Sequence, residues 1–513
     1  MSQPNRLMRG FATVGLWTLL SRIFGFVRDV LIAGFLGSGP VAEAFLIAFS
    51  LPNMFRRFFA EGAFNMAFVP MFSKKVESGE GPHEFARDAF TGLATILIVF
   101  TVIAQIFMPA LVLLMASGFA ADERLDLATL FGRIAFPYIL FISLAALLSG
   151  VLNATGRFVA AAAAPVLLNV LFIAAVTSAY YGGWEIGLTL AWTVPIAGIA
   201  QLALVWAAAS RAGYTLIPTL PRMTPELKRL AIIAAPAALA GGVVQINLLV
   251  GRNVASWTEG AIAWVNYADR LYQLPLGVVA IAIGVVLLPE LSRRLQAGDT
   301  AGGQDALSRA AEVALALTLP CAIALIVIPG PMVSILFERG QFSADDAAAT
   351  ALAVAVYGLG LPAFVLQKIF QPLYFAREDT KRPFQFALVS MVVNAVVAVS
   401  LWAYLDYLAA ALATSLAAWS MAWLLWRYSR DFGEAAQFDL RFRTRLPRIV
   451  FASLLLGVVL YGLMLLLNPL LGAEGWRYAA LAVLLILGGI SYAILGRMVG
   501  AFKPAELKAA LRR

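Results

Sequence analysis

The chain alternates between long apolar stretches and short polar segments. A helix needs about 20 predominantly apolar residues to cross the hydrocarbon core of a bilayer. This length predicts fourteen membrane-spanning helices, near residues 10–34, 40–72, 89–115, 128–152, 161–181, 187–208, 229–252, 262–290, 309–330, 348–373, 384–404, 407–426, 448–468 and 477–500. We therefore expect an all-α polytopic membrane protein.

The composition supports this class, with 61% hydrophobic and 13% charged residues among 513. The first apolar stretch does not fit a cleavable signal peptide, because it is long and contains Arg22 and Arg28. The one cysteine, Cys321, excludes a disulfide framework, and the one histidine, His83, leaves no His/Cys metal cluster. We expect no metal and no other cofactor.

The charge distribution predicts the topology. If the N-terminus is cytoplasmic, 27 of the 38 Lys and Arg fall in inside loops and tails, five lie on the other side, and six lie within spans. This asymmetry follows the positive-inside rule and predicts that both termini are cytoplasmic. The net charge of +9 is then a consequence of topology, and we expect no nucleic-acid partner.

The sequence repeats at an offset of about 223 residues. Leu51-Pro52 matches Leu274-Pro275, and Pro137 with Asn169 matches Pro362 with Asn394. An even number of spans in each copy predicts two parallel six-helix repeats with the substrate site between them. The expected parts are an N-terminal lobe at 1–208, a cytoplasmic linker at 209–228, a C-terminal lobe at 229–428, a basic cytoplasmic loop at 429–447, and the two extra helices with the tail at 448–513.

Two segments outside the lobes have local signals. Thr224-Pro225-Glu226 predicts a helix N-cap, a first-turn proline and an early acid. The basic loop before the thirteenth span fits ordinary positive-inside topology, and lipid head-group binding is the alternative. Its arginines are Arg441, Arg443, Arg445 and Arg448.

Five arginines lie inside predicted spans: Arg22, Arg28, Arg56, Arg57 and Arg270. An arginine at the centre of a spanning helix costs roughly 2.5–3.5 kcal/mol on insertion scales. A cavity that holds several of them favours an anion, and guanidinium groups suit phosphate because they can bind it bidentately. We expect Arg22, Arg28, Arg56 and Arg270 to contact an anionic ligand. Snorkelling and helix stapling are the alternatives.

Acidic residues in the same spans are candidates for supporting ion pairs: Asp29, Glu43, Glu61 and Asp269. Arg57 and Glu61 are one helical turn apart, so Arg57 fits a structural pair better than a ligand contact. Gly25, Gly34, Pro52 and Pro275 are hinge candidates, since proline removes a backbone donor and bends a helix. A static kink is the alternative.

Three segments carry a family resemblance: SRIFGFVRD at 21–29, LPNMFRRFFAEGAFNMAFVP at 51–70 and YADRLYQLPLGV at 267–278. The chain resembles the MurJ/MviN lipid II flippases of the multidrug/oligosaccharidyl-lipid/polysaccharide exporter superfamily over essentially its whole length. The resemblance implies transport of lipid II, the undecaprenyl-diphosphate-linked peptidoglycan precursor, from the inner to the outer leaflet of the bacterial cytoplasmic membrane for cell-wall synthesis.

The resemblance also implies roles for residues and helices. It places Arg22, Arg28, Arg56 and Arg270 at the diphosphate and a lipid-tail groove along the thirteenth and fourteenth spans. The chain departs from the family pattern at Glu43, where the acid is usually Asp, and at Ser50, where some relatives have Lys.

We expect alternating access by a monomer, driven by the membrane potential, with lipid II and membrane lipids as partners and no coupling ion assigned. Another lipid-linked oligosaccharide exporter or a multidrug exporter of the same superfamily is an alternative, but the cationic substrates of drug exporters favour acids over arginines in the cavity. A membrane-embedded glycosyltransferase is less consistent, because the outer loops show no acid paired with a nucleophile or metal motif.

Overall fold

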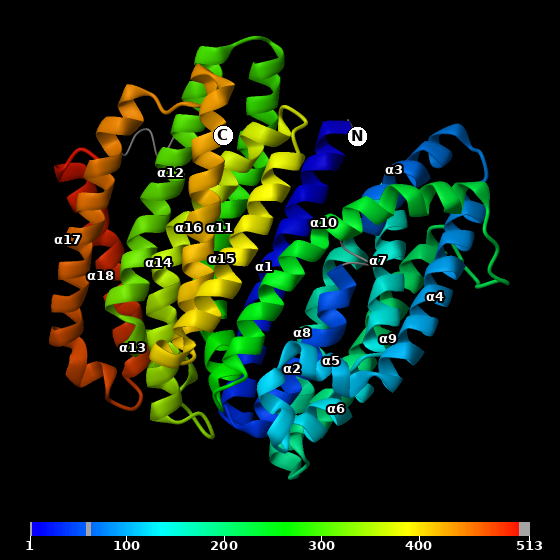
Figure 1. Ribbon diagram of the computed structural model, residues 1–513, viewed down its shortest axis with the longest axis horizontal. Helices are drawn as coiled ribbons and strands as arrows, with labels where there is room; N and C mark the ends of the chain where they lie inside the picture. Colours follow the sequence, from blue (N-terminus) through cyan, green and yellow to red (C-terminus); the bar gives the residue numbers. More distant parts are fainter. Residues whose placement is uncertain (1–2, 58–62, 502–513) are drawn as a thin grey trace. The chain divides into compact units, whose positions relative to one another are not determined.

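The computed structural model describes residues 3–57 and 63–501. The regular structure in these residues is helical apart from one isolated antiparallel bridge between Arg339 and Phe342 (Figure 1). The all-α fold is therefore confirmed. The chain forms two compact units: unit 1 runs to Ala263 and includes Arg339–Phe342, and unit 2 holds Trp264–Glu338 and the chain from Ser343 onward.

Helices of unit 1 begin at residues that favour helix starts. Pro40 and Pro82 occupy the first turns of their helices, each after a glycine. Thr224 caps its helix by accepting a hydrogen bond from the Leu227 amide at 3.2 Å, which confirms the predicted cap. The helices are α1 (Gln3–Leu36), α2 (Pro40–Arg56), α3 (Ala63–Ser78), α4 (Pro82–Ile106), α5 (Met108–Met115), η2 (Ser117–Ala121), α6 (Arg124–Ala135), α7 (Tyr138–Ala154), α8 (Val159–Gly182), α9 (Ile186–Arg211) and α10 (Pro225–Ala255).

Unit 2 contains longer helices, several with internal prolines. Ser343 and Asp346 form a reciprocal capping box at the start of α14. The helices are α11 (Ala261–Gln296), whose first three residues belong to unit 1, α12 (Thr300–Val327), α13 (Pro329–Phe337), α14 (Ala344–Phe375), α15 (Lys381–Leu405), α16 (Leu408–Ser429), η3 (Arg430–Phe432), η4 (Glu434–Ala436), α17 (Leu440–Leu471) and α18 (Arg477–Met498).

The internal repeat is visible in the packing within each unit. In unit 1, α8 packs on α9 and α7 packs on α9; in unit 2, α15 packs on α16 and α14 packs on α16. The short helices α5 and α13 occupy matching places after α4 and α12. Asn169 on α8 and Asn394 on α15 are both buried. The duplicated packing is therefore seen within each unit, whereas the parallel arrangement of two six-helix repeats stays a prediction.

Ten helices in the described residues are long and apolar enough to cross a membrane. The remaining predicted spans correspond to α1, α2 with α3, α10 and α11. Within the span predicted at 40–72, α2 ends at Arg56, α3 begins at Ala63, and residues 58–62 lie outside the described residues. The count of fourteen stays a prediction.

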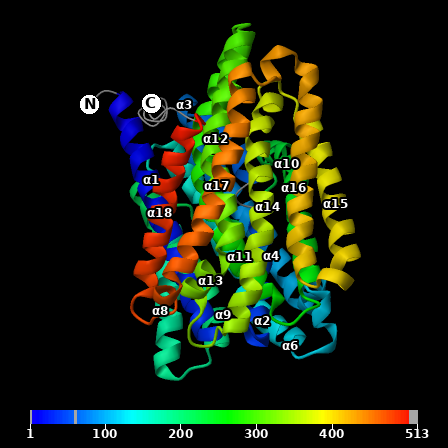
Figure 2. The same ribbon diagram turned by 90° about the vertical axis from the view of Figure 1, so that its left-hand side faces the viewer.

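The two extra helices, α17 and α18, lie side by side in both views (Figures 1 and 2). Gly488 allows this close approach, since a Cβ there would lie 2.7 Å from Leu460 Cδ2 of α17. Gly457 of α17 lies close to α12 in the same way, since a Cβ there would lie 2.9 Å from Ile323 Cγ2. Glu312 of α12, which is buried, accepts hydrogen bonds from Arg441 and Arg445 of α17. Two arginines of the basic loop thus anchor α17 to α12.

The N-terminal end of α10 packs with the first repeat. This helix contacts α3, α4 and α5, and unit 1 accordingly extends past the predicted linker to Ala263. The lobe boundaries at 208 and 229 rest on the sequence repeat and stay predictions.

Candidate functional site

Arg28 is buried within unit 1. Its Nε and Nη2 donate to Asp29 Oδ1 at 3.0 and 2.7 Å, and its Nη1 donates to Asn169 Oδ1 at 3.0 Å. Arg28 and Asp29 are 7% and 6% exposed. The guanidinium carbon lies 5.9 Å from the Phe49 ring centroid and 5.6 Å from that of Phe172. This charge is therefore held by an acid, a carboxamide and two aromatic rings.

A guanidinium group carries five N–H donors. The three hydrogen bonds to Asp29 and Asn169 use three of them. Within the described residues, two N–H donors of Arg28 are left for a ligand. Asp29 meanwhile offsets the positive charge, which explains how α1 tolerates an arginine at this depth.

The sequence motif at 21–29 has a clear helical geometry. At about 100° per residue, Ser21, Gly25 and Arg28 share one face of α1. This face meets α8, where Asn169 Nδ2 donates to the Ser21 carbonyl oxygen at 3.0 Å. A Cβ at Gly25 would lie 3.5 Å from Asn169 Nδ2, which is an ordinary contact. Gly25 thus lies where α8 approaches α1, and nothing in the structure tests a hinge there.

Arg22 points differently from Arg28. Six residues separate them, which places them about 120° apart around α1. Arg22 is exposed, on the side that also carries the exposed Leu19 and Ile23. The two arginines of this motif therefore occupy different environments.

Arg56 is the last residue of α2 and is half-buried, and Arg57 follows it and is exposed. Both make interactions with other groups. Glu61, the predicted partner of Arg57, lies outside the described residues. The predicted Arg57–Glu61 pair therefore stays a prediction.

Arg270 and Asp269 are half-buried on α11 in unit 2. Gln273 Nε2, one turn further along, donates to Asp269 Oδ2. The Tyr272 ring stacks on Tyr357 of α14 with centroids 5.0 Å apart. Asp269 and Arg270 thus lie beside an aromatic contact between α11 and α14, and Pro275 follows within the same helix.

Glu43, a candidate ion-pair residue, pairs with an arginine that the sequence pattern did not indicate. It is 0% exposed, and its Oε2 lies 2.8 Å from Arg124 Nη1. Its Oε1 accepts a hydrogen bond from the Ile262 amide at 3.0 Å. Arg124 also pairs with Asp122 at 2.6 Å. Glu43 is thus an ion-pair residue, but its partner Arg124 is not one of the predicted ligand-binding arginines.

The Glu43 network lies where α2, α6 and the start of α11 meet. The guanidinium of Arg124 lies over the Phe119 ring, 4.5 Å from its centroid. The hydrogen bonds that Arg124 donates to Asp122 hold the pKa of this carboxyl below the ordinary value for aspartate. The segment Phe119-Ala-Ala-Asp122-Glu123 has a counterpart in Phe342-Ser-Ala-Asp345-Asp346 of the second repeat, which is a sequence signal for this region.

The remaining hinge candidates have distinct surroundings. A Cβ at Gly34 would lie 2.8 Å from Arg339 Cγ, and the Gly34 carbonyl accepts from the Gln341 amide at 2.8 Å. Gly34 therefore allows a close approach of the Arg339–Phe342 segment. Pro52 is buried within α2. A role in movement stays a prediction for all four candidates.

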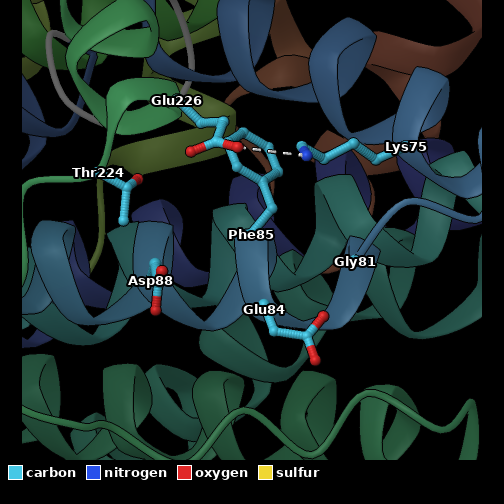
Figure 3. A pocket seen from close by; sticks show the side chains of 7 residues that line it. All are labelled: Lys75, Gly81, Glu84, Phe85, Asp88, Thr224 and Glu226. Carbon is cyan, nitrogen blue, oxygen red and sulfur yellow. Dashed lines mark ion pairs between the residues drawn. The ribbon is translucent and has the colours of Figure 1, made fainter.

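A small cavity of about 230 Å³ lies between α4 and the start of α10. Figure 3 shows Lys75 and Glu226 pointing toward each other across the Phe85 ring, with 3.7 Å between Nζ and Oε1. A hydrogen bond from its own backbone amide and the nearby Lys75 ammonium lower the pKa of Glu226. These contacts tie the linker to the first repeat and involve none of the predicted ligand-binding arginines.

No group of three or more His, Cys, Asp and Glu side chains in residues 3–57 and 63–501 could hold a metal ion. Guanidinium groups offer several N–H donors and a permanent positive charge, which is the chemistry that suits an anion.

Comparisons with known proteins agree with this chemistry. The family model described as Lipid II flippase MurJ matches residues 32–503. A probable lipid II flippase MurJ of Rhizobium meliloti (strain 1021) is 47% identical over 462 residues, covering 89% of this chain and 86% of that protein. One of Rhizobium tropici is 41% identical over 518 residues, covering 99% and 97%.

Solved structures give the same result. A lipid II flippase MurJ in an inward closed conformation matches with a TM-score of 0.79 at 26% identity, covering 95% of this chain and 99% of that chain. A multidrug resistance MATE family transporter in an inward-facing conformation matches with a TM-score of 0.66 at 15% identity, covering 81% and 95%. The second match shows a shared fold only.

Proposed function

The chain belongs to the lipid II flippase MurJ family, and from this membership we propose that the arginines of its predicted spans hold the diphosphate of lipid II during alternating access. It is a multi-pass membrane protein and a lipid II flippase, hence a transporter. The proposal concerns the residues that hold the substrate, the direction of transport and the driving force.

One observation carries the proposal: Arg28 is buried, its charge is offset by Asp29, and two of its N–H donors have no hydrogen bond to described residues. Two parallel N–H groups can bind phosphate oxygens bidentately. Arg22 and Arg56 belong to the same unit, and Arg270 is added from the expectation that both repeats line one cavity. Arg57 is left out, because its spacing from Glu61 favours a pair.

The proposed cycle starts with both termini in the cytoplasm of a bacterium. The head group of lipid II enters from the inner leaflet of the cytoplasmic membrane, binds the arginines, and leaves to the outer leaflet when the lobes rock. The polyprenyl tail stays in lipid throughout. We propose that the monomer performs this cycle, because each chain carries both repeats.

Transport into vesicles tests the arginine assignment. Full-length protein reconstituted with lipid II should lose transport with Arg28→Ala or Arg270→Ala, and Arg28→Lys should retain a small part, since a single ammonium cannot form the bidentate contact. An excess of undecaprenyl diphosphate should inhibit, whereas undecaprenol should not. Wild-type rates in both alanine variants would remove these residues from the site.

The membrane potential is the proposed driving force. Moving one elementary charge through 100 mV is worth about 2.3 kcal/mol, so a head group with about two negative charges would gain about 4.6 kcal/mol on leaving a negative interior. The same vesicles clamped at several potentials test this proposal. Transport should accelerate as the side from which lipid II departs becomes more negative, and a rate independent of voltage would exclude it.

A further inference from the structure

Asn169 joins two helices through both ends of its carboxamide. On α8, 141 residues after Arg28, its Oδ1 accepts from Arg28 Nη1 and its Nδ2 donates to the Ser21 carbonyl oxygen, each at 3.0 Å. The side chain is 5% exposed. A reversed amide would set its N–H groups against the guanidinium, so these two bonds determine how the carboxamide lies.

The two partners of Arg28 contribute differently to its charge. Asp29 is ionic and neutralises the guanidinium, whereas Asn169 accepts a hydrogen bond without adding negative charge. A second carboxylate at position 169 would give the Arg28 cluster a net negative charge. A neutral acceptor therefore orients the guanidinium while leaving it able to attract an anion.

The rings of Phe49 and Phe172 lie within 6 Å of the guanidinium carbon, at 5.9 and 5.6 Å. Together with Asp29 and Asn169, they restrict the group to one position. Preorganised donors bind an anion more tightly than mobile ones, because binding then costs no further side-chain entropy.

We propose that Asn169 is a positioning residue for lipid II: it orients Arg28 so that the two remaining N–H donors can bind the diphosphate. This inference rests on the proposed role of Arg28. The competing interpretation is that Asn169 only staples α1 to α8, and the two interpretations differ in what they predict for substrate affinity.

Transport by reconstituted full-length protein at increasing lipid II content separates them. Asn169→Ala should raise the half-saturating lipid II content about tenfold, which corresponds to about 1.4 kcal/mol for one hydrogen bond to a charged group. The maximal rate should change much less. Asn169→Asp keeps an acceptor for Arg28 but adds a charge, so it should raise half-saturation further, with a thermal unfolding midpoint no lower than that of Asn169→Ala.

Gln201→Ala is the matched control. Gln201 is also a buried carboxamide, and it links α9 to α8 and α7 through the Ala164 carbonyl at 2.8 Å and the Tyr138 hydroxyl at 3.2 Å. It contacts no arginine through these bonds. Its loss should lower the thermal unfolding midpoint and leave half-saturation near the wild-type value.

The outcomes separate this inference from the proposed function. If Arg28→Ala transports normally, the proposed function fails. If Arg28→Ala is inactive but Asn169→Ala lowers only thermal stability, as Gln201→Ala does, Asn169 is a staple and the inference is wrong. A wild-type half-saturating lipid II content in Asn169→Asp would lead to the same conclusion. In an Arg28→Lys background with residual transport, Asn169→Ala should add much less than tenfold, since the oriented fork is already lost.

Discussion

The Glu43–Arg124 pair should be among the strongest single stabilising contacts of unit 1. The carboxylate of Glu43 is fully buried and accepts hydrogen bonds from Arg124 Nη1 at 2.8 Å, from the Ile262 amide at 3.0 Å and from the Gly260 backbone. Arg124→Ala removes the cation and leaves only neutral backbone donors. Breaking a buried pair from one side costs about 3–5 kcal/mol, because the remaining charge is uncompensated.

A second substitution shows whether that cost comes from the stranded charge. In the Arg124→Ala background, Glu43→Gln replaces the buried carboxylate with a neutral amide of the same shape. Adding Glu43→Gln should raise the free energy of unfolding of the Arg124→Ala variant by about 2 kcal/mol or more, because an isolated buried charge is more costly than a buried amide. Glu43→Gln alone should destabilise the wild-type background, since Arg124 then loses an ionic partner.

Equilibrium unfolding of the four proteins in mixed micelles gives the required double-mutant cycle. The expected result is a coupling free energy of several kcal/mol. If Arg124→Ala costs less than about 1 kcal/mol, as an exposed pair would, or if Glu43→Gln destabilises equally in both backgrounds, the burial argument is refuted.

Three further predictions concern packing and anchoring. Gly118→Ala should clearly lower the thermal unfolding midpoint, because its Cβ would lie 2.2 Å from a backbone oxygen. Gly25→Ala should be tolerated, because its Cβ would lie 3.5 Å from its nearest neighbour. Equal unfolding midpoints in the two variants would contradict the geometry. Glu312→Ala should cost about 2–3 kcal/mol and raise hydrogen exchange at the start of α17, since two arginines lose their shared partner; unchanged exchange there would show that the anchor is unimportant. Lys75→Ala should change the free energy of unfolding by less than about 1 kcal/mol, because its pair with Glu226 is partly exposed. A larger loss would show that this ion pair stabilises the protein more than a partly exposed pair should.

The architecture could be predicted because its signals are local and repeated. Apolar length predicted the helices, and matched prolines and asparagines at one offset predicted the duplication. The Thr224 cap followed from three adjacent residues.

The site was predictable only in part. The cost of burying arginine marked Arg28, but its partner Asn169 lies 141 residues away on α8. Arg124 lies outside the predicted spans, and its partner Glu43 lies 81 residues earlier. Spacing rules such as i,i+4 describe neighbours on one helix, so pairs between distant helices become visible only when the helices pack.

The central claim is that Arg28 binds the diphosphate of lipid II. The most direct measurement is complementation of a bacterium depleted of its own flippase, with the leaflet distribution of lipid II assayed and protein levels matched. We predict that Arg28→Ala leaves lipid II in the inner leaflet and fails to restore growth, and that Arg28→Lys restores growth only in part. Full growth with outer-leaflet lipid II in the Arg28→Ala strain would contradict the account.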